Sequence, residues 1–124
     1  MRAKTTILVF LLFFLNACTN RMEKELIGKW KGVELLEEGE PLAIDPAEIQ
    51  FEFFPKNDYS FSSTLNYREA GQYRVQTDYL FTTDTTRAEG AEKIVRILQL
   101  EADTLVLEMK DQEKTRELKL LRTH

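Results

Sequence analysis

The sequence has few of the residues on which metal and thiol chemistry usually depend. Among its 124 residues there is one cysteine, Cys18, and one histidine, His124, which is the last residue. A single cysteine excludes an internal disulfide, and a metal site built on it would need further cysteine or histidine ligands. A catalytic thiolate would need a partnering base, and none is identifiable. We therefore expect no metal site and no cofactor.

Catalytic motifs and excess positive charge are also missing. There is no His-x-x-x-His pair, no glycine-rich phosphate loop and no Gly-x-Ser-x-Gly. The carboxylates Glu34, Glu37, Glu38 and Glu40 cluster around one turn, which is typical of solvated surface. With 17 basic and 21 acidic residues the net charge is −4, which argues against binding nucleic acid. We expect a non-enzymatic protein without catalytic residues.

Long apolar runs are missing too, apart from a short one near the start. Arg2 and Lys4 precede nine consecutive apolar residues at positions 7–15. A nine-residue helix would span about 14 Å, roughly half of the ~30 Å hydrocarbon core of a bilayer. The layout is typical of a secretory signal peptide, which we place at residues 1–17.

The residues at the end of this segment, Leu15-Asn16-Ala17-Cys18, resemble the lipobox of bacterial lipoproteins. The resemblance implies cleavage before Cys18, a diacylglycerol on its thiol and an acyl chain such as palmitate on its amino group. Several acyl chains give stable membrane anchoring. Thr19, where an aspartate would favour the inner membrane, implies the periplasmic face of the outer membrane. The alternative is an ordinary signal peptide with a cysteine nearby by chance.

The mature chain fits one domain. Removing residues 1–17 leaves 15 basic and 21 acidic residues, a net charge of −6, and this also disfavours a polybasic membrane surface. Residues 18–24 carry no apolar pattern and are interpreted as a lipid-anchored tether. No repeat or linker divides residues 25–122, which we expect to fold as one monomeric unit.

This domain follows a period of two, which is typical of β-strands. The apolar residues Ile49, Phe51 and Phe53 alternate with the polar residues at positions 48, 50 and 52. Strands joined by short turns at intervals of 8–12 residues predict an all-β, eight-stranded antiparallel up-and-down barrel, with a β-sandwich as the alternative. The expected strands cover residues 29–36, 48–53, 59–65, 72–75, 79–83, 94–100, 104–109 and 115–121.

Two stretches do not follow the alternation. Trp30 and Val33 have opposite parity, which a bulge at Gly32 would reconcile. Residues 94–98 are apolar at both parities, so their inward face is not defined by pattern alone.

The entry to the first strand, Ile27-Gly28-Lys29-Trp30, is similar to the first-strand signature of lipocalins. The segment IGKWKGVELLEEGE, with FEFFPKNDYSF, GQYRV and EADTLVLEM further on, resembles the short lipocalin-like domains of bacterial lipoproteins. The resemblance implies a barrel whose closed end is formed by Gly28, Trp30 and Arg122, with the arginine over the indole. The alternative for Arg122 is a solvated terminal charge. The disulfides and long loops of larger lipocalins are missing.

An eight-stranded barrel is either filled by its own side chains or wide enough for one small ligand. A cavity would suit a small apolar or amphipathic molecule, oriented by the hydroxyls of Tyr59 and Tyr73 or by the polar run at residues 60–63. A filled barrel would instead make the chain a structural or protein-interaction module of the envelope. Trp30, Leu35, Leu118 and Leu120 are expected to point inward as core. The inward residues expected to line a ligand site are Phe51, Phe53, Tyr59, Phe61, Tyr73, Phe81, Leu105 and Leu107.

Overall fold

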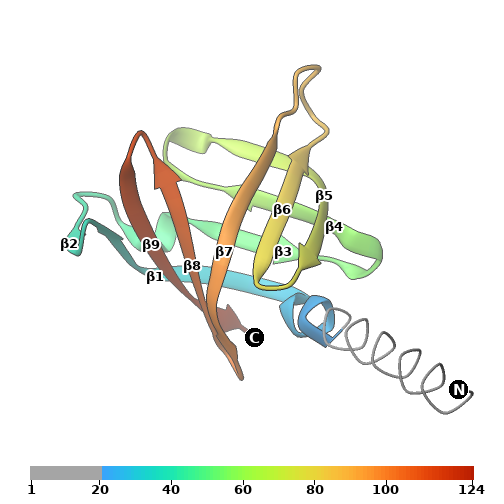
Figure 1. Ribbon diagram of the computed structural model, residues 1–124, viewed down its shortest axis with the longest axis horizontal. Helices are drawn as coiled ribbons and strands as arrows, with labels where there is room; N and C mark the ends of the chain where they lie inside the picture. The colour runs from blue at the N-terminus through green and yellow to red at the C-terminus, as the bar shows by residue number, and fades with distance from the viewer. Residues whose placement is uncertain (1–20) are drawn as a thin grey trace, which may run out of the picture.

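The computed structural model describes residues 21–124, and these form a closed β-barrel (Figure 1). Each strand pairs antiparallel with its neighbour in the chain, and β1 closes the barrel by pairing with both β3 and β9. The predicted eight-stranded up-and-down barrel is confirmed. Its strands are β1 (Gly28–Glu37), β3 (Gln50–Phe53), β4 (Asp58–Ser62), β5 (Arg68–Gln76), β6 (Tyr79–Asp84), β7 (Glu92–Glu101), β8 (Thr104–Asp111) and β9 (Lys114–Thr123).

Short elements fill the connections between these strands. A two-residue strand, β2 (Glu40–Pro41), folds back on the end of β1. Single 3-10 turns follow: η1 (Pro46–Glu48), η2 (Pro55–Asn57) and η3 (Thr64–Asn66). Proline at the start of η1 and η2 suits a first helical position, because its ring fixes φ and no amide donor is lost there.

Bulges resolve both stretches that broke the alternation. The pairing of β1 with β9 shifts between Gly32 and Glu34, so Trp30 and Leu35 both face inward while Val33 is exposed. The pairing of β7 with β8 shifts in the same way between Ile97 and Gln99. The predicted bulge at Gly32 is therefore confirmed. The second bulge lets Ile97 and Leu100 both face the core, whereas Ile94 and Leu98 are apolar residues exposed on the outer face.

Two strand boundaries differ from the sequence-based expectation by three residues or more. The strand predicted to reach Leu65 ends at Ser62, and Leu65 is 99% exposed in η3. The strand predicted at residues 72–75 extends over β5 from Arg68 to Gln76. Its inward positions include Glu69 and Gly71, which carry no apolar signal, so the period of two was hidden there.

The chain joins the barrel earlier than expected. Residues 21–26 form a helical turn, and Glu23 accepts hydrogen bonds from the Val75 amide (3.1 Å) and the Asn57 side chain (2.9 Å). Residues 21–24 are therefore part of the folded unit, and the predicted tether is too long at this end. The predicted signal peptide at residues 1–17, the lipidation site Cys18 and Thr19 lie outside the described residues.

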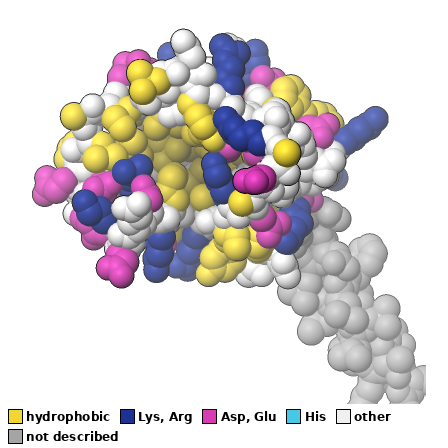
Figure 2. All heavy atoms as spheres, turned by 90° about the horizontal axis from the view of Figure 1, so that it is seen from above, with side chains coloured by type: hydrophobic (Ala, Val, Ile, Leu, Met, Phe, Trp, Pro, Cys, Tyr) yellow, Lys and Arg dark blue, Asp and Glu magenta, His cyan; other side chains and the backbone are white. Residues whose placement is uncertain are grey.

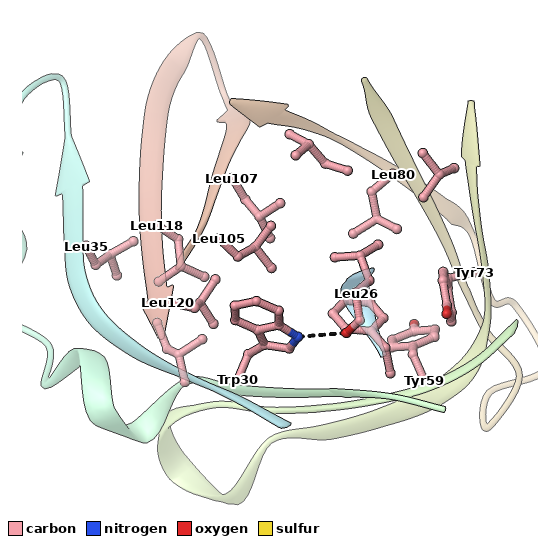
Figure 3. Packing of buried hydrophobic residues seen from close by; sticks show 14 residues of the cluster. Leu26, Trp30, Leu35, Tyr59, Tyr73, Leu80, Leu105, Leu107, Leu118 and Leu120 are labelled. Atoms are coloured by element: carbon pink, nitrogen blue, oxygen red, sulfur yellow. Dashed lines mark hydrogen bonds between the residues drawn. The ribbon is translucent and has the colours of Figure 1, made fainter. Parts of the chain in front are cut away.

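The core fills the end of the barrel next to this helical turn. Figure 3 shows Leu26 and Trp30 among leucines from β6, β8 and β9, with Tyr59 and Tyr73 beside them. Leu26, Leu80, Leu105, Leu107 and Leu120 have lost essentially all solvent exposure.

Candidate functional site

The two ends of the barrel differ in how they are closed. The helical turn at residues 21–26, η2 and the turns after β5 and β7 lie at one end, which we call the closed end. The segment after β1 and the connections after β4, β6 and β8 lie at the other, which we call the mouth. Trp30 covers the closed end from inside, and its indole nitrogen donates to the Leu26 carbonyl at 2.7 Å (Figure 3).

Arg122 fixes the closed end from the last strand. Its guanidinium carbon lies 4.3 Å from the centre of the Trp30 ring, and its terminal nitrogens donate to the carbonyls of Ile27 and Glu25, both at 2.6 Å. Gly28 has φ of +133°, and a Cβ there would lie 2.6 Å from the guanidinium. The expected placement of Arg122 over Trp30 is confirmed, and Gly28 is required by both space and backbone conformation.

The mouth contains an apolar hollow. Figure 2, which looks into this end, shows hydrophobic side chains gathered in a depression. In the register Trp30, Phe51, Phe61 and Glu69 are cross-strand partners facing inward, and the Phe51 and Phe61 rings lie 4.7 Å apart. We use the name mouth hollow for the half-buried apolar side chains that pack on the core at this end: Leu42, Ile44, Phe51, Phe61 and Met109.

A polar cluster stands beside the mouth hollow. We call it the mouth cluster, and it consists of Tyr67, Glu69, Asp84, Arg87 and Lys93. These residues line a cavity of about 300 Å³ together with Glu89, Gly90 and Ala91. The carboxylates Glu69 and Asp84 are each 6% exposed, whereas the side chains of Arg87 and Lys93 are about half exposed.

Asp84 organises the connection after β6. Its carboxylate accepts hydrogen bonds from the amide (2.9 Å) and hydroxyl (2.5 Å) of Thr86 and pairs with Arg87. Arg87 also donates to the Tyr67 hydroxyl at 3.2 Å and to the Arg68 carbonyl at 3.3 Å. Arg87 thus links the connection after β6 to the one after β4 across the mouth.

Glu69 binds the other cation. Its carboxylate accepts hydrogen bonds from Lys93 and from the Tyr67 hydroxyl, both at 3.0 Å. The Tyr67 ring stands edge-on to Phe61, with ring centres 6.1 Å apart. Tyr67 therefore contacts both the mouth cluster and the mouth hollow, so polar and apolar surfaces meet at this residue.

The pKa shifts follow from these contacts. The pKa of the Asp84 carboxyl is lowered mainly by the hydrogen bond from the Thr86 hydroxyl; burial opposes this, and Arg87 adds to it. Burial alone would lower the pKa of Lys93, but the hydrogen bond and charge of Glu69 outweigh it and the pKa is raised. Asp84 and Lys93 therefore stay charged at neutral pH.

Tyrosines inside the barrel resist ionisation. Burial, followed by the charge of Glu69, raises the pKa of Tyr59 to about 12. Burial and the charge of Glu23 raise the pKa of Tyr73 to about 12 as well. The Tyr73 hydroxyl donates to the Phe54 carbonyl at 3.4 Å, so it bonds to the protein's own backbone rather than facing the mouth hollow.

The residues predicted to line a ligand site separate into three groups. Phe51 and Phe61 line the mouth hollow. Phe81 was expected to face inward, and this is wrong: Leu80 takes the inward position, while Phe81 lies under Arg74 on the outer face, with 3.9 Å from guanidinium to ring centre. The rest are packed in the filled part of the barrel: Phe53, Tyr59, Tyr73, Leu105 and Leu107.

The serines considered as orienting groups face away from the interior. Ser60 and Ser62 line a groove of about 550 Å³ that crosses β1, β3, β4 and β5. In the register Ser60 is paired with Glu52 and Ala70, and Glu52 with exposed Lys29, which places this row on the outer face. The same groove is also lined by Phe51, Phe61 and Glu69, which face inward.

The mouth cluster was not predicted from the sequence. Glu69 and Asp84 occupy inward strand positions, and the available signal was their parity relative to Tyr73 and Leu80. Within residues 21–124 no three potential metal-ligating side chains come together as a candidate metal site. The same stretch contains no helix whose length and apolar character would let it cross a bilayer.

The comparisons with known proteins concern the fold. No protein-family model and no curated protein matches this chain. Among solved structures it is similar to an uncharacterized protein from Bacteroides eggerthii DSM 20697, with a TM-score of 0.56 and 14% identity, over 79% of this chain and 99% of that one. The class defined by fold and likeness is an eight-stranded antiparallel closed barrel.

Proposed function

We propose that this chain is a lipid-anchored, lipocalin-like protein of the bacterial cell envelope that binds the apolar part of a small amphipathic molecule in the mouth hollow. The observation that carries the proposal is the pair Phe51 and Phe61, which are only partly buried inside the barrel while the side chains below them are packed. Ligand sites in proteins are concave, mostly apolar and bordered by a few polar groups. The mouth cluster supplies such groups.

The lipocalin-like assignment is supported by the closed end. A Gly-x-Trp at the start of the first strand and an arginine of the last strand over the indole form the arrangement implied by the family resemblance. Here Arg122 lies against both Gly28 and Trp30.

Anchoring through Cys18 at the periplasmic face of the outer membrane is the second part of the proposal. It is supported by the lipobox-like sequence before Cys18 and by Thr19. The test is detergent phase partitioning of cells that express Cys18→Ala. We expect the wild type in the detergent phase and the variant to lose lipid labelling; a variant still labelled and partitioned like the wild type contradicts the anchor.

Ligand binding is tested by native mass spectrometry. Residues 19–124 are expressed in the native host behind an ordinary secretory signal and purified without detergent, so that an endogenous ligand is retained. We expect a stoichiometric apolar adduct. Protein that is consistently empty and does not bind an environment-sensitive dye such as anilinonaphthalene sulfonate contradicts the proposal.

Two phenylalanine variants locate the binding site. Phe61→Ala removes an inner wall of the mouth hollow, whereas Phe81→Ala removes a similarly half-buried ring from the outer face. We expect dye affinity to fall about tenfold in Phe61→Ala, because a lost aromatic contact is worth on the order of 1–2 kcal/mol, and to be unchanged in Phe81→Ala. Equal losses in both variants would place the dye elsewhere.

The alternative is a structural or protein-interaction module. One observation favours it: Tyr79, Ile94 and Leu98 are 43%, 55% and 40% exposed on neighbouring strands β6 and β7. Two other apolar residues do not extend this patch, because Val95 packs against the core and Phe54 lies in the connection after β3. An empty barrel together with a protein partner lost in Ile94→Ser would support this alternative.

A further inference from the structure

The helical turn at residues 21–26 is fixed to the closed end of the barrel. Leu26 is fully buried beneath Trp30, and Met22 packs against the core. Glu23 is bonded to Val75 and Asn57, which belong to β5 and η2. The direction in which the chain leaves the barrel is therefore set by the fold.

The distance between this turn and Cys18 is short. Three residue steps separate Cys18 from Arg21, and a fully extended chain covers at most about 11 Å over such a distance. The ten residues of β1 run from the closed end to the mouth, about 33 Å along the strand and roughly 25 Å along the axis of a tilted barrel. A lipid on Cys18 could not reach a membrane that the mouth faces directly.

The closed end also presents side chains suited to a bilayer surface. Lys24 and Lys56 line the same hollow between the helical turn and η2, and neither forms an ion pair with any residue in the range 21–124. Phe54, immediately before η2, is 38% exposed. Lysines are attracted to anionic headgroups, and aromatic rings are favoured at the interface between lipid and water.

We propose that the closed end, around Lys24, Phe54 and Lys56, rests on the surface of the bilayer that holds the Cys18 lipid, so that the mouth opens away from that membrane. The inference depends on the lipid anchor of the proposed function. It adds that the mouth hollow exchanges its ligand with the aqueous compartment or with a partner located there, and not with the supporting membrane directly.

The test measures how close each end lies to the lipid. Cys18 is the only cysteine, and its thiol is blocked once it is lipidated, so one introduced cysteine is the only labelling site. The full lipidated protein carries Lys56→Cys at the closed end, Leu65→Cys at the mouth, or Lys110→Cys on the opposite side of the mouth. Each is fluorescently labelled and reconstituted into vesicles of phosphatidylcholine and phosphatidylglycerol whose headgroups carry a nitroxide quencher.

We expect severalfold stronger quenching at position 56 than at positions 65 and 110. Lys56→Cys removes one of the lysines proposed to contact the membrane. This loss would weaken membrane contact at position 56 and reduce quenching there, which makes the comparison stricter. Quenching at either mouth position that equals that at position 56 would mean that the barrel lies on its side or is inverted, and would overturn the proposal. Protein that does not float with the vesicles would contradict the lipid anchor itself, which distinguishes the two failures.

Discussion

The closed end and the mouth are built from the same eight strands, but they use their side chains differently. At the closed end, the Trp30 indole donates a hydrogen bond to the Leu26 carbonyl, and the Arg122 guanidinium donates hydrogen bonds to backbone carbonyls. The polar groups of both side chains therefore have partners. At the mouth, Phe51 and Phe61 are only partly buried and lie next to buried carboxylates whose cations reach solvent. The difference indicates that stability is concentrated at one end and that the other is available for binding.

Removal of the indole gives the largest effect that this comparison predicts. Trp30→Ala should lower the free energy of unfolding by about 3–5 kcal/mol, because it leaves a large cavity in a packed site. Phe61→Ala at the mouth should cost only ~1–2 kcal/mol, because its ring is only partly buried. Urea unfolding followed by far-ultraviolet circular dichroism measures both; equal losses would mean that the two ends are equally packed.

The glycines provide a matched pair with positive φ. Gly28 at the closed end has φ of +133° with Arg122 against it, while Gly39 in the connection after β1 has φ of +81° and nothing within 4 Å. We expect Gly28→Ala to cost ~1–3 kcal/mol from strain and displacement of Arg122, and Gly39→Ala about 1 kcal/mol or less from strain alone. Thermal unfolding of the two variants compares them. A larger loss in Gly39→Ala would contradict the role assigned to the closed end.

Two glutamates of the helical turn sharpen the comparison further. Glu23→Ala leaves the Val75 amide without its acceptor and should cost about 1–2 kcal/mol. Glu25→Ala removes only an exposed pair with Arg21 and should change stability by less than about 0.5 kcal/mol. Hydrogen exchange of the Val75 amide is the direct measurement: it should accelerate in Glu23→Ala and not in Glu25→Ala.

The smallest effect on the stability of the whole barrel is expected from a change of pH, which acts on Asp84 at the mouth. The pKa of Asp84 is lowered in the folded chain, so its contribution is present above the ordinary aspartate pKa of about 4 and is lost as pH falls through the lower folded value. The connection after β6 should therefore loosen only in strong acid. The Thr86 amide shift, followed by nuclear magnetic resonance, should titrate below pH 4 in the wild type and lose this step in Asp84→Asn. A step at the ordinary value would contradict it.

Most of the strand order followed from alternation, because one side of every strand is buried. Phe51 and Phe53, or Leu105 and Leu107, repeat at intervals of two residues and so define their own inner face. Phe81 was assigned to the wrong face because both faces of β6 carry large apolar side chains, so alternation does not show which face is buried. The outward direction of Phe81 is seen only from its pairing with Arg74 on the neighbouring strand.

The mouth cluster was inaccessible to this kind of reasoning for a different reason. Glu69 and Lys93 lie 24 residues apart, Asp84 and Arg87 lie three residues apart, and all four are charged residues of ordinary types. An acid in a strand usually faces solvent, and burial becomes favourable here only because the cations reach it from other strands and connections.

By itself the sequence determined the all-β class, the number of barrel strands, the bulge at Gly32 and the residues of the closed end. These depend on local periodicity, on turn residues and on a short motif next to the first strand. Only the tertiary structure decided that the barrel is filled at one end and hollow at the other, and that two acids are buried at the mouth. Both properties depend on which strand positions face inward and on side chains brought together from several strands, and strand pairing and barrel closure set these.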